Sequence, residues 1–192
     1  FEGVTSVAAG DEHSLAVAGG LAYSWGSDSR GQLGMGSFQE DGERYRCRPD
    51  TVQGEGAGSG GENYLSGAKA VFAGAKQSFA LMEDTSLYGW GNNEHGQLGS
   101  GQPSAPYYRG TIAKVLFSQG NFTVSGVTDV AVGRDHTLIL MENGTARAFG
   151  SNQFGQLGIV FSWEDLYDSS NAYKYYGMSG SSNPNGAYTS SV

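Results

Sequence analysis

The side chains best suited to chemistry are few in this sequence, and their spacing builds neither a catalytic nor a metal site. The chain has three histidines and a single cysteine, scattered without the spacing of zinc ligands. His13 directly precedes Ser14, but neighbours on a strand point to opposite faces, so the pair is no part of a catalytic triad. Cys47 has no partner for an internal disulfide. We therefore expect no enzyme, no cofactor and no bound metal.

Two further stretches could be taken for ligand loops. Residues 54–62, "GEGAGSGGE", lack the terminal Lys–Ser/Thr and the following helix of a phosphate-binding loop. Residues 40–43, "EDGE", could hold Ca²⁺ weakly but lack the alternating ligands of a calcium loop, so we interpret them as a solvated acidic loop. The net charge of −8 argues against a nucleic-acid partner, because such partners are bound largely through Lys and Arg.

Three other features point to recognition. Asn121 and Asn143 begin Asn-x-Thr sequons in expected loops or turns, and as candidate N-glycosylation sites they favour a secreted or cell-surface location. Chance alone can produce two sequons in a chain this rich in Ser and Thr. Trp163, with Asp165 and Tyr167, is the candidate partner-binding site, since Trp and Tyr dominate interaction hot spots. The alternative is that Trp163 covers the edge of its own repeat.

These residues are positioned by a repeat that occurs three times. "GQLG" begins at Gly31, Gly96 and Gly155, each five positions after the glycine of an aromatic–Gly pair. The shared anchors are Gly10, Gly74 and Gly133, then Trp25, Trp90 and Phe149, then Gln32, Gln97 and Gln156. Equivalent residues in every copy indicate a structural role, and a fixed period indicates a repeat architecture. His13 and His136 are also equivalent, but Gln77 stands in the second copy, so no metal or proton chemistry repeats.

Each repeat is predicted to form four short strands. Alternating apolar residues, such as Leu15 and Val17, predict strands, and Gly19–Gly20 and Asn143–Gly144 predict two-residue hairpin turns. The second copy has "EDTS" there, which predicts a different turn. A glycine-rich crossing loop through GQLG follows, and the predicted fourth strands are Arg48 to Gln53 and Thr111 to Phe117. Four antiparallel strands about every 60 residues predict an all-β chain of about three β-propeller blades.

The repeat resembles that of the regulator of chromosome condensation family. The residues that carry the resemblance are "AGDEHSLAVAGGLAYSWGSDSRGQLGMG" and its two further copies, about half of the chain. The resemblance implies a β-propeller, commonly of about seven blades, whose face loops make the contacts. It also implies roles such as guanine-nucleotide exchange, nucleosome binding, β-lactamase inhibition or scaffolding. Fold alone does not choose among them.

The aromatic and structural anchors have expected roles in this architecture. Trp25, Trp90 and Phe149 should fill the space between blades, and the glycines after them should permit a bend or a close backbone approach. The GQLG glutamines should satisfy backbone groups of the crossing loops. The inserts between the anchored stretches, residues 37–67, 102–126 and 159–187, do not match the family.

The predicted organisation is one propeller segment over residues 1–192. The repeats are about 3–67, 68–126 and 127–187, and 188–192 are interpreted as the start of a fourth, because Val192 matches Val7, Val71 and Val130 in steps of 64, 59 and 62. Such an arc is a partial propeller or one share of a larger ring, completed by further repeats or by copies of itself.

Two functions remain open on the sequence. The first is a non-enzymatic protein-interaction or scaffold module that acts through insert loops on the propeller face, as part of a larger assembly that could be extracellular. The second is a guanine-nucleotide exchange factor-like regulator of a small GTPase, which would need a complete ring. The expected partners are proteins, including copies of the chain. No stretch is long and apolar enough to span a membrane.

Overall fold

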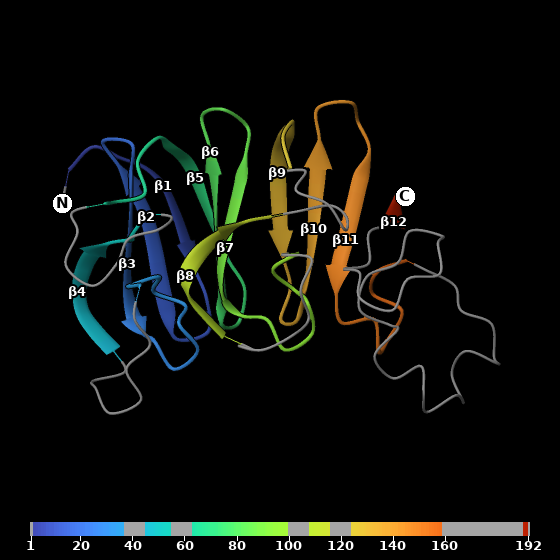
Figure 1. Cartoon of the computed structure of the whole chain (residues 1–192), viewed down its shortest axis with the longest axis horizontal. Coiled ribbons are helices and arrows are strands. Elements are labelled where there is room, and N and C mark those ends of the chain that lie inside the picture. Colours follow the sequence, from blue (N-terminus) through green and yellow to red (C-terminus); the bar gives the residue numbers. More distant parts are fainter. Residues whose placement is uncertain are drawn as a thin grey trace.

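The computed structural model describes residues 2–36, 45–54, 63–99, 108–115, 124–158 and 190–191. These residues form three four-stranded antiparallel sheets that stand side by side, as the sequence predicts (Figure 1). Among them, no helix is long and apolar enough to cross a membrane. Asn121, Trp163, Asp165 and Tyr167 lie outside the described residues.

Each sheet is built from strands that follow one another along the chain. The first sheet contains β1 (Val4–Ala9), β2 (His13–Ala18), β3 (Leu21–Ser27) and β4 (Tyr45–Thr51). The second contains β5 (Ala68–Ala73), β6 (Gln77–Met82), β7 (Leu87–Asn92) and β8 (Tyr108–Lys114). The third contains β9 (Val127–Val132), β10 (His136–Met141), β11 (Ala146–Gly150) and β12 (Ser190–Ser191). The fourth strands of the first two sheets, β4 and β8, thus begin three residues before the predicted starts at Arg48 and Thr111.

The hairpin turns lie together at one edge of the sheets, at the top of Figure 1. Gly19 and Gly20 both have positive φ, as a two-residue turn requires. The predicted two-residue turn at Asn143–Gly144 is wrong, because Met141 N donates to Thr145 O and closes a turn of three residues. Thr85 and Gly144 have φ of 66° and 80°, so the "EDTS" turn and the third turn share one type, with a left-handed third residue.

The last strand corrects the predicted start of a fourth repeat at 188–192. Ser190 and Ser191 pair with Ala148 and Arg147 of β11, at the outer edge of the third sheet. The same register joins the outer strands of the other sheets, through Ser24–Asp50 and Tyr23–Thr51 and through Gly89–Ala113 and Tyr88–Lys114. Because β11 would otherwise present an unpaired edge, the chain returns after a long insert to pair with it.

The hydrophobic core lies between the sheets. Side chains of β2 and β5 pack together between the first and second sheets, with Trp90 fully buried among them. Phe79, Leu81, Ile139 and Phe149 form the equivalent core between the second and third sheets. A sheet pair therefore buries apolar side chains that neither sheet could bury alone.

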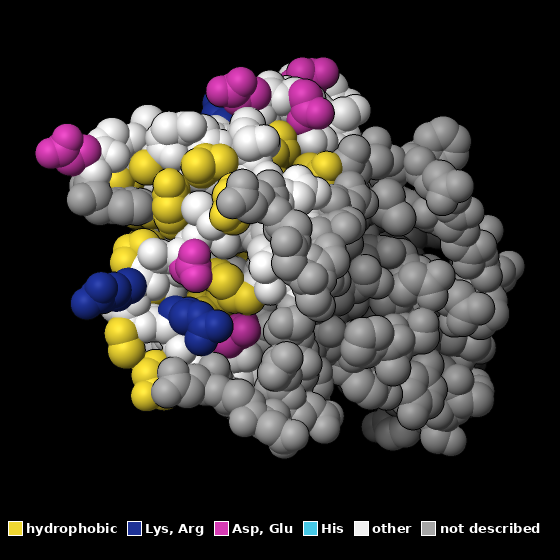
Figure 2. Space-filling view, turned by 60° about the vertical axis from the view of Figure 1, so that its left-hand side comes forward, with side chains coloured by type: hydrophobic (Ala, Val, Ile, Leu, Met, Phe, Trp, Pro, Cys, Tyr) yellow, Lys and Arg dark blue, Asp and Glu magenta, His cyan; other side chains and the backbone are white. Residues whose placement is uncertain are grey.

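The two outermost sheet faces differ from the buried ones. Trp25 is half-buried, whereas Trp90 and Phe149 are buried, because no sheet precedes the first one among the described residues. Figure 2, in which the first sheet comes forward, shows hydrophobic side chains gathered between charged groups on this side. On the third sheet, Leu138 and Leu140 are exposed, although their equivalents Phe79 and Leu81 are buried.

Candidate functional site: the crossing-loop edge

The crossing loops, residues 28–34, 93–99 and 152–158, lie at the edge opposite the hairpin turns (Figure 1). In each, the side chain of an Asp or Asn accepts from the leucine amide five residues later, at 2.9 Å, and its carbonyl accepts from the first glycine of GQLG, at 3.0–3.1 Å. The second glycine of GQLG then donates to the carbonyl of the first. The three loops therefore share one hydrogen-bonded framework.

The glutamine of GQLG holds the apex of each loop from within. The Oε1 atoms of Gln32, Gln97 and Gln156 accept from the backbone amides of Arg30, His95 and Phe154 at 2.7–2.8 Å. Gln32 and Gln97 are fully buried and Gln156 is partly exposed. The glutamines thus fix the backbone of the residue two positions before them.

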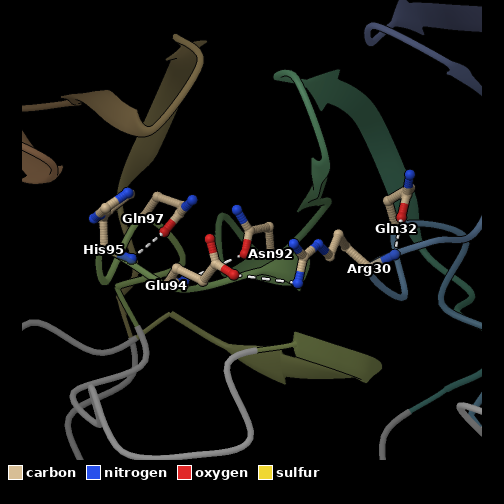
Figure 3. Close-up of polar contacts among 6 residues, drawn as sticks. All are labelled: Arg30, Gln32, Asn92, Glu94, His95 and Gln97. Atoms are coloured by element: carbon tan, nitrogen blue, oxygen red, sulfur yellow. Dashed lines mark hydrogen bonds and ion pairs between the residues drawn. The ribbon is translucent and has the colours of Figure 1, made fainter.

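The residue at the apex differs in every loop, although its backbone is held in the same way. Arg30 is a cation, His95 an imidazole and Phe154 an aromatic ring that is 87% exposed. Arg30 Nη1 lies 3.1 Å from Glu94 Oε1 of the next loop (Figure 3). We call the set of Arg30, Glu94, His95 and Phe154 the crossing-loop edge; it offers a charged pair on the first two loops and an exposed aromatic ring on the third, side chains suited to binding protein.

One acid of the framework is electrostatically perturbed. Burial raises the pKa of Asp28, and the amide of Leu33 and the charge of Arg46 oppose that rise. Asn93 and Asn152 occupy the same position without a charge and make the same bond to the leucine amide. The carboxylate is therefore one way of building the framework, and the repeated element is the side-chain oxygen.

Side chains of the following sheet donate hydrogen bonds to the backbone carbonyl of the glutamine in the first two loops. Gln32 O accepts from Ser78 Oγ at 2.8 Å and from Trp90 Nε1 at 2.9 Å, both on the following sheet. Thr137 Oγ1 donates to Gln97 O at 2.9 Å in the same way. The first two loops are thus held by the glutamine side chain of their own sheet and by a hydroxyl of the next sheet.

His13 completes the first of these contacts as a neutral ring. Its Nε2 lies 2.9 Å from Ser78 Oγ, and because that hydroxyl donates to Gln32 O, Nε2 is the donor to it. The Nδ1 atom is buried without a hydrogen-bond partner, so a second proton would have no acceptor. Burial lowers the pKa of His13 to about 4, with the carboxylate of Asp11 opposing the shift.

We predict that His13→Gln removes an acid sensitivity of stability. Between the ordinary pKa of 6.5 and about 4, the unfolded chain binds a proton at His13 that the folded chain does not. The free energy of unfolding should therefore fall as pH drops through that window, by about 3 kcal/mol in all. Gln77, the natural equivalent, donates from Nε2 to Gly133 O and Arg134 O, so glutamine has acceptors available at this position.

Urea denaturation of both chains from pH 8 to pH 4 measures this effect. The difference in unfolding free energy between wild type and His13→Gln should move in favour of the variant below pH 6.5. His95→Gln, which removes a histidine from the exposed loop, is the matched control and should keep the wild-type profile. Parallel profiles for wild type and His13→Gln would contradict the role given to His13.

The residues singled out from the sequence lie in different parts of the structure. The repeat anchors meet at and behind the crossing-loop edge, whereas Asn143 is exposed at the opposite edge, where its Oδ1 accepts from the amide and hydroxyl of Thr145. Trp163 and its neighbours cannot be related to either edge, because they lie outside the described residues. Within the described part of the chain, no three His, Cys, Asp or Glu side chains group as metal ligands.

Sequence reasoning missed the framework acids and amides and the apex residues. Asp28, Asn93 and Asn152 each stand two positions after the aromatic–Gly glycine, so their spacing was available as a signal. The apex residues gave no such signal, because they have nothing in common except their position before GQLG.

Family models agree with the repeated framework. A model described as "Regulator of chromosome condensation (RCC1) repeat" matches residues 4–32, 68–97 and 127–156, and a second model with this description matches residues 84–140.

Curated relatives carry similar sequences. The probable E3 ubiquitin-protein ligase HERC6 of Homo sapiens is 32% identical over 159 residues, 81% of this chain and 14% of the relative. The ultraviolet-B receptor UVR8 of Arabidopsis thaliana is 32% identical over 157 residues, 81% of this chain and 31% of the relative. The secretion-regulating guanine nucleotide exchange factor of Bos taurus is 34% identical over 138 residues, which cover 71% of this chain and 25% of the relative. The chain therefore spans less than a third of the length of each.

Solved structures agree on the fold. Yeast RCC1 (Prp20), in a crystal structure with Kap60 bound, superposes with a TM-score of 0.68 at 21% identity, over 98% of this chain and 37% of that one. Human WBSCR16 superposes with a TM-score of 0.61 at 27% identity, over 78% of this chain and 34% of that one. The three sheets thus have the arrangement of blades in these proteins.

Proposed function

Because the chain belongs to the regulator of chromosome condensation (RCC1) repeat family, we propose that it is a non-enzymatic protein-interaction module that binds a protein partner through its crossing-loop edge. In this role the sheets are a rigid support, and the apex residues of successive loops are the recognition surface. The chain would serve as a scaffold within a larger assembly.

The observation that carries the proposal is the contrast between fixed backbone and varied apex. Three loops hold the backbone of the apex residue with the same glutamine bond, at 2.7–2.8 Å, yet present Arg30, His95 and Phe154. A residue that only stabilised the loop would be expected to repeat with it, as the glutamines do. The ring of Phe154 is 87% exposed and is therefore accessible to a partner.

The charge balance favours a protein over a nucleic acid as the partner. The net charge of −8 repels phosphate backbones, and the crossing-loop edge pairs its one arginine with Glu94. Aromatic rings and arginines are the side chains enriched in protein–protein contacts. Among the relatives, the structure of yeast RCC1 was solved with Kap60 bound.

A secreted or cell-surface setting remains part of the proposal. Asn143 stands exposed on a hairpin turn, and a glycan there would leave the crossing-loop edge open, since the two lie at opposite edges of the sheets (Figure 1). Treatment of the native protein with a glycosidase should then lower its mass. An unchanged mass would remove this support for an extracellular location.

Site-specific photocross-linking tests the proposed surface. With p-benzoyl-phenylalanine in place of Phe154, irradiation in an extract of the native tissue should give one dominant adduct with a different protein. The same amino acid in place of Glu142, exposed at the hairpin edge, is the matched control and should give none. The partner identified from the adduct is then titrated against the purified chain.

A double variant makes the test specific to the surface. Arg30→Ala with His95→Ala should weaken the titrated affinity at least fivefold and leave folding intact, because an exposed ion pair contributes at most about 1 kcal/mol to stability. Glu83→Ala with Glu142→Ala, at the hairpin edge, should bind as wild type does. Adducts from position 142 in place of 154, or unchanged affinity of the loop variant, would contradict the proposal.

The second candidate is regulation of a small GTPase by nucleotide exchange. It is favoured by one observation, the 34% identity with a secretion-regulating guanine nucleotide exchange factor over 25% of that relative's length. Release of fluorescent GDP from purified small GTPases separates the two candidates. Acceleration of tenfold or more by the chain would favour exchange, and an unchanged rate would favour the interaction module.

A further inference from the structure

Asn143 and Gly144 lie in the turn between β10 and β11, at the hairpin edge (Figure 1). Both residues are exposed, and nothing lies within 4 Å of a Cβ added to Gly144. The carboxamide carbon of an asparagine can be attacked by the backbone nitrogen of the next residue, and a glycine leaves that nitrogen the most accessible. The pair therefore has the residue types and the exposure for an intramolecular reaction.

Two hydrogen bonds hold the carboxamide of Asn143 over the turn. Thr145 donates to Asn143 Oδ1 from its backbone amide at 3.0 Å and from its hydroxyl at 2.7 Å. Because Thr145 directly follows Gly144, these bonds fold the carboxamide back beside the peptide that contains Gly144 N. They also favour a negative charge on Oδ1, as donors do around a developing oxyanion. The bonds thus prepare Asn143 Cγ for attack by a nucleophile.

The nucleophilic nitrogen is restrained by the hydrogen bond that closes the turn. Gly144 N donates to Met141 O at 2.9 Å, and this bond must open before the nitrogen can face Asn143 Cγ. The bond belongs to an exposed turn, where backbone hydrogen bonds open at the lowest cost in free energy. Reaction in the folded chain therefore requires local opening of one turn and not unfolding of the third sheet.

The other asparagines of the described residues lack this combination. Each is followed by a residue with a side chain, and two of them are buried. Asn143 is therefore the one asparagine in the described ranges that is both exposed and followed by glycine. The others are Asn63, Asn92, Asn93 and Asn152.

We propose that Asn143 is a site of spontaneous deamidation. Gly144 N forms a bond to Asn143 Cγ and gives up its proton, and Nδ2 takes a proton and leaves as ammonia, so a cyclic imide joins the two residues. Water then opens the imide at either of its carbonyl carbons, which gives aspartate or isoaspartate. The chain becomes one charge more negative. This inference is independent of the partner proposed for the crossing-loop edge.

The second sheet shows that an aspartate fits this place in the turn. Asp84 has the position of Asn143 in the turn between β6 and β7, and Ser86 donates to its Oδ1 from both the amide and the hydroxyl. The aspartate product therefore keeps the turn, whereas isoaspartate lengthens its backbone. Either product lacks Nδ2, the atom to which an N-glycan is attached, so a deamidated copy can no longer be glycosylated at this position.

Peptide mapping of the folded chain tests the proposal. The chain is produced in a bacterial host that attaches no N-glycan, and is incubated at pH 7 and at pH 9 before digestion. Trypsin releases residues 135–147, in which Asn143 is the sole asparagine. Relative to an unincubated sample, this peptide should gain about 1 Da, faster at pH 9, in two chromatographic forms that correspond to aspartate and isoaspartate. An unchanged mass, or an aspartate form alone, would overturn the proposal.

Gly144→Ala tests the role of the glycine. A methyl group beside the nucleophilic nitrogen should slow the gain of mass at Asn143 about tenfold. Circular dichroism checks that the variant is folded. Asn63, which is exposed but precedes Tyr64, is the control within the same chain and should keep its mass. Equal rates in wild type and Gly144→Ala, or conversion of Asn63 as fast as that of Asn143, would overturn the proposal.

Discussion

Trp90→Ala should lower the free energy of unfolding by about 3–5 kcal/mol, the range for deleting a fully buried large aromatic side chain. Trp90 is completely buried between the first two sheets and packs against Val52 and the backbone of Gly34. Its truncation also removes the donor to Gln32 O. The cavity would lie between the first and second sheets, so the lost packing would weaken the contact of the two sheets.

The equivalent position in the first sheet is the matched control for this prediction. Trp25→Ala removes the same side chain from a half-buried position, so it should cost only about 1–2 kcal/mol. Trp90→Phe should fall between wild type and Trp90→Ala, because Phe149 fills this position in the third sheet. Equal losses for Trp90→Ala and Trp25→Ala in urea denaturation would contradict the burial argument.

Gly91→Ala should be nearly as damaging, although it adds one methyl group. Gly91 has a φ of 98°, and a Cβ there would lie 2.5 Å from Lys76 O and 3.2 Å from Gln32 Cα. Both are backbone atoms, so no side-chain rotation relieves the contacts. We expect a loss of about 3–5 kcal/mol, the sum of a left-handed non-glycine residue and an overpacked contact.

Gly144→Ala separates the two causes. Gly144 also has a positive φ, of 80°, but nothing lies within 4 Å of a Cβ added there. This variant should lose only about 1 kcal/mol, the conformational cost alone. Thermal or urea unfolding of both variants gives the comparison, and similar losses would show that the approach of Lys76 and Gln32 to Gly91 has no energetic weight.

The fold could be predicted because its determinants recur along the chain. A strand pattern or an aromatic–Gly pair is ambiguous once, but Trp25, Trp90 and Phe149 in register before three GQLG segments leave few architectures open. A local turn could also be predicted, since Gly19–Gly20 predicts a turn with two positive φ values and the structure has that turn.

The errors arose where pairing depends on distant segments. The sequence around Ser190 and Ser191 resembles the start of a repeat, yet the open edge of β11 takes these residues as its outer strand. Nothing local distinguishes an inner strand from an outer one when both are short and alternate in polarity. The turn at Asn143–Gly144 differs from its prediction for a local reason, because its length depends on whether Met141 or Glu142 ends the strand.

The candidate site was the least predictable part. The prediction of Trp163 rests on residue type, whereas the crossing-loop edge is defined by position, with the backbones of Arg30, His95 and Phe154 held by equivalent glutamine bonds. The exposure of Phe154 cannot be read from its sequence context, since Trp25 and Trp90 show that equivalent aromatic residues differ in burial with the neighbouring sheet.

Because the second sheet completes the hydrogen bonds of the first crossing loop, the fold also sets an order of events during synthesis. The carbonyl of Gln32 is bound by Ser78 and Trp90, so the first crossing loop stays incomplete until those residues have left the ribosome. At 5–20 residues per second, the 56 residues from Gly34 to Trp90 take roughly 3–11 s. During that interval the nascent first sheet has an uncovered face, and a chaperone that binds apolar strands has its best opportunity there.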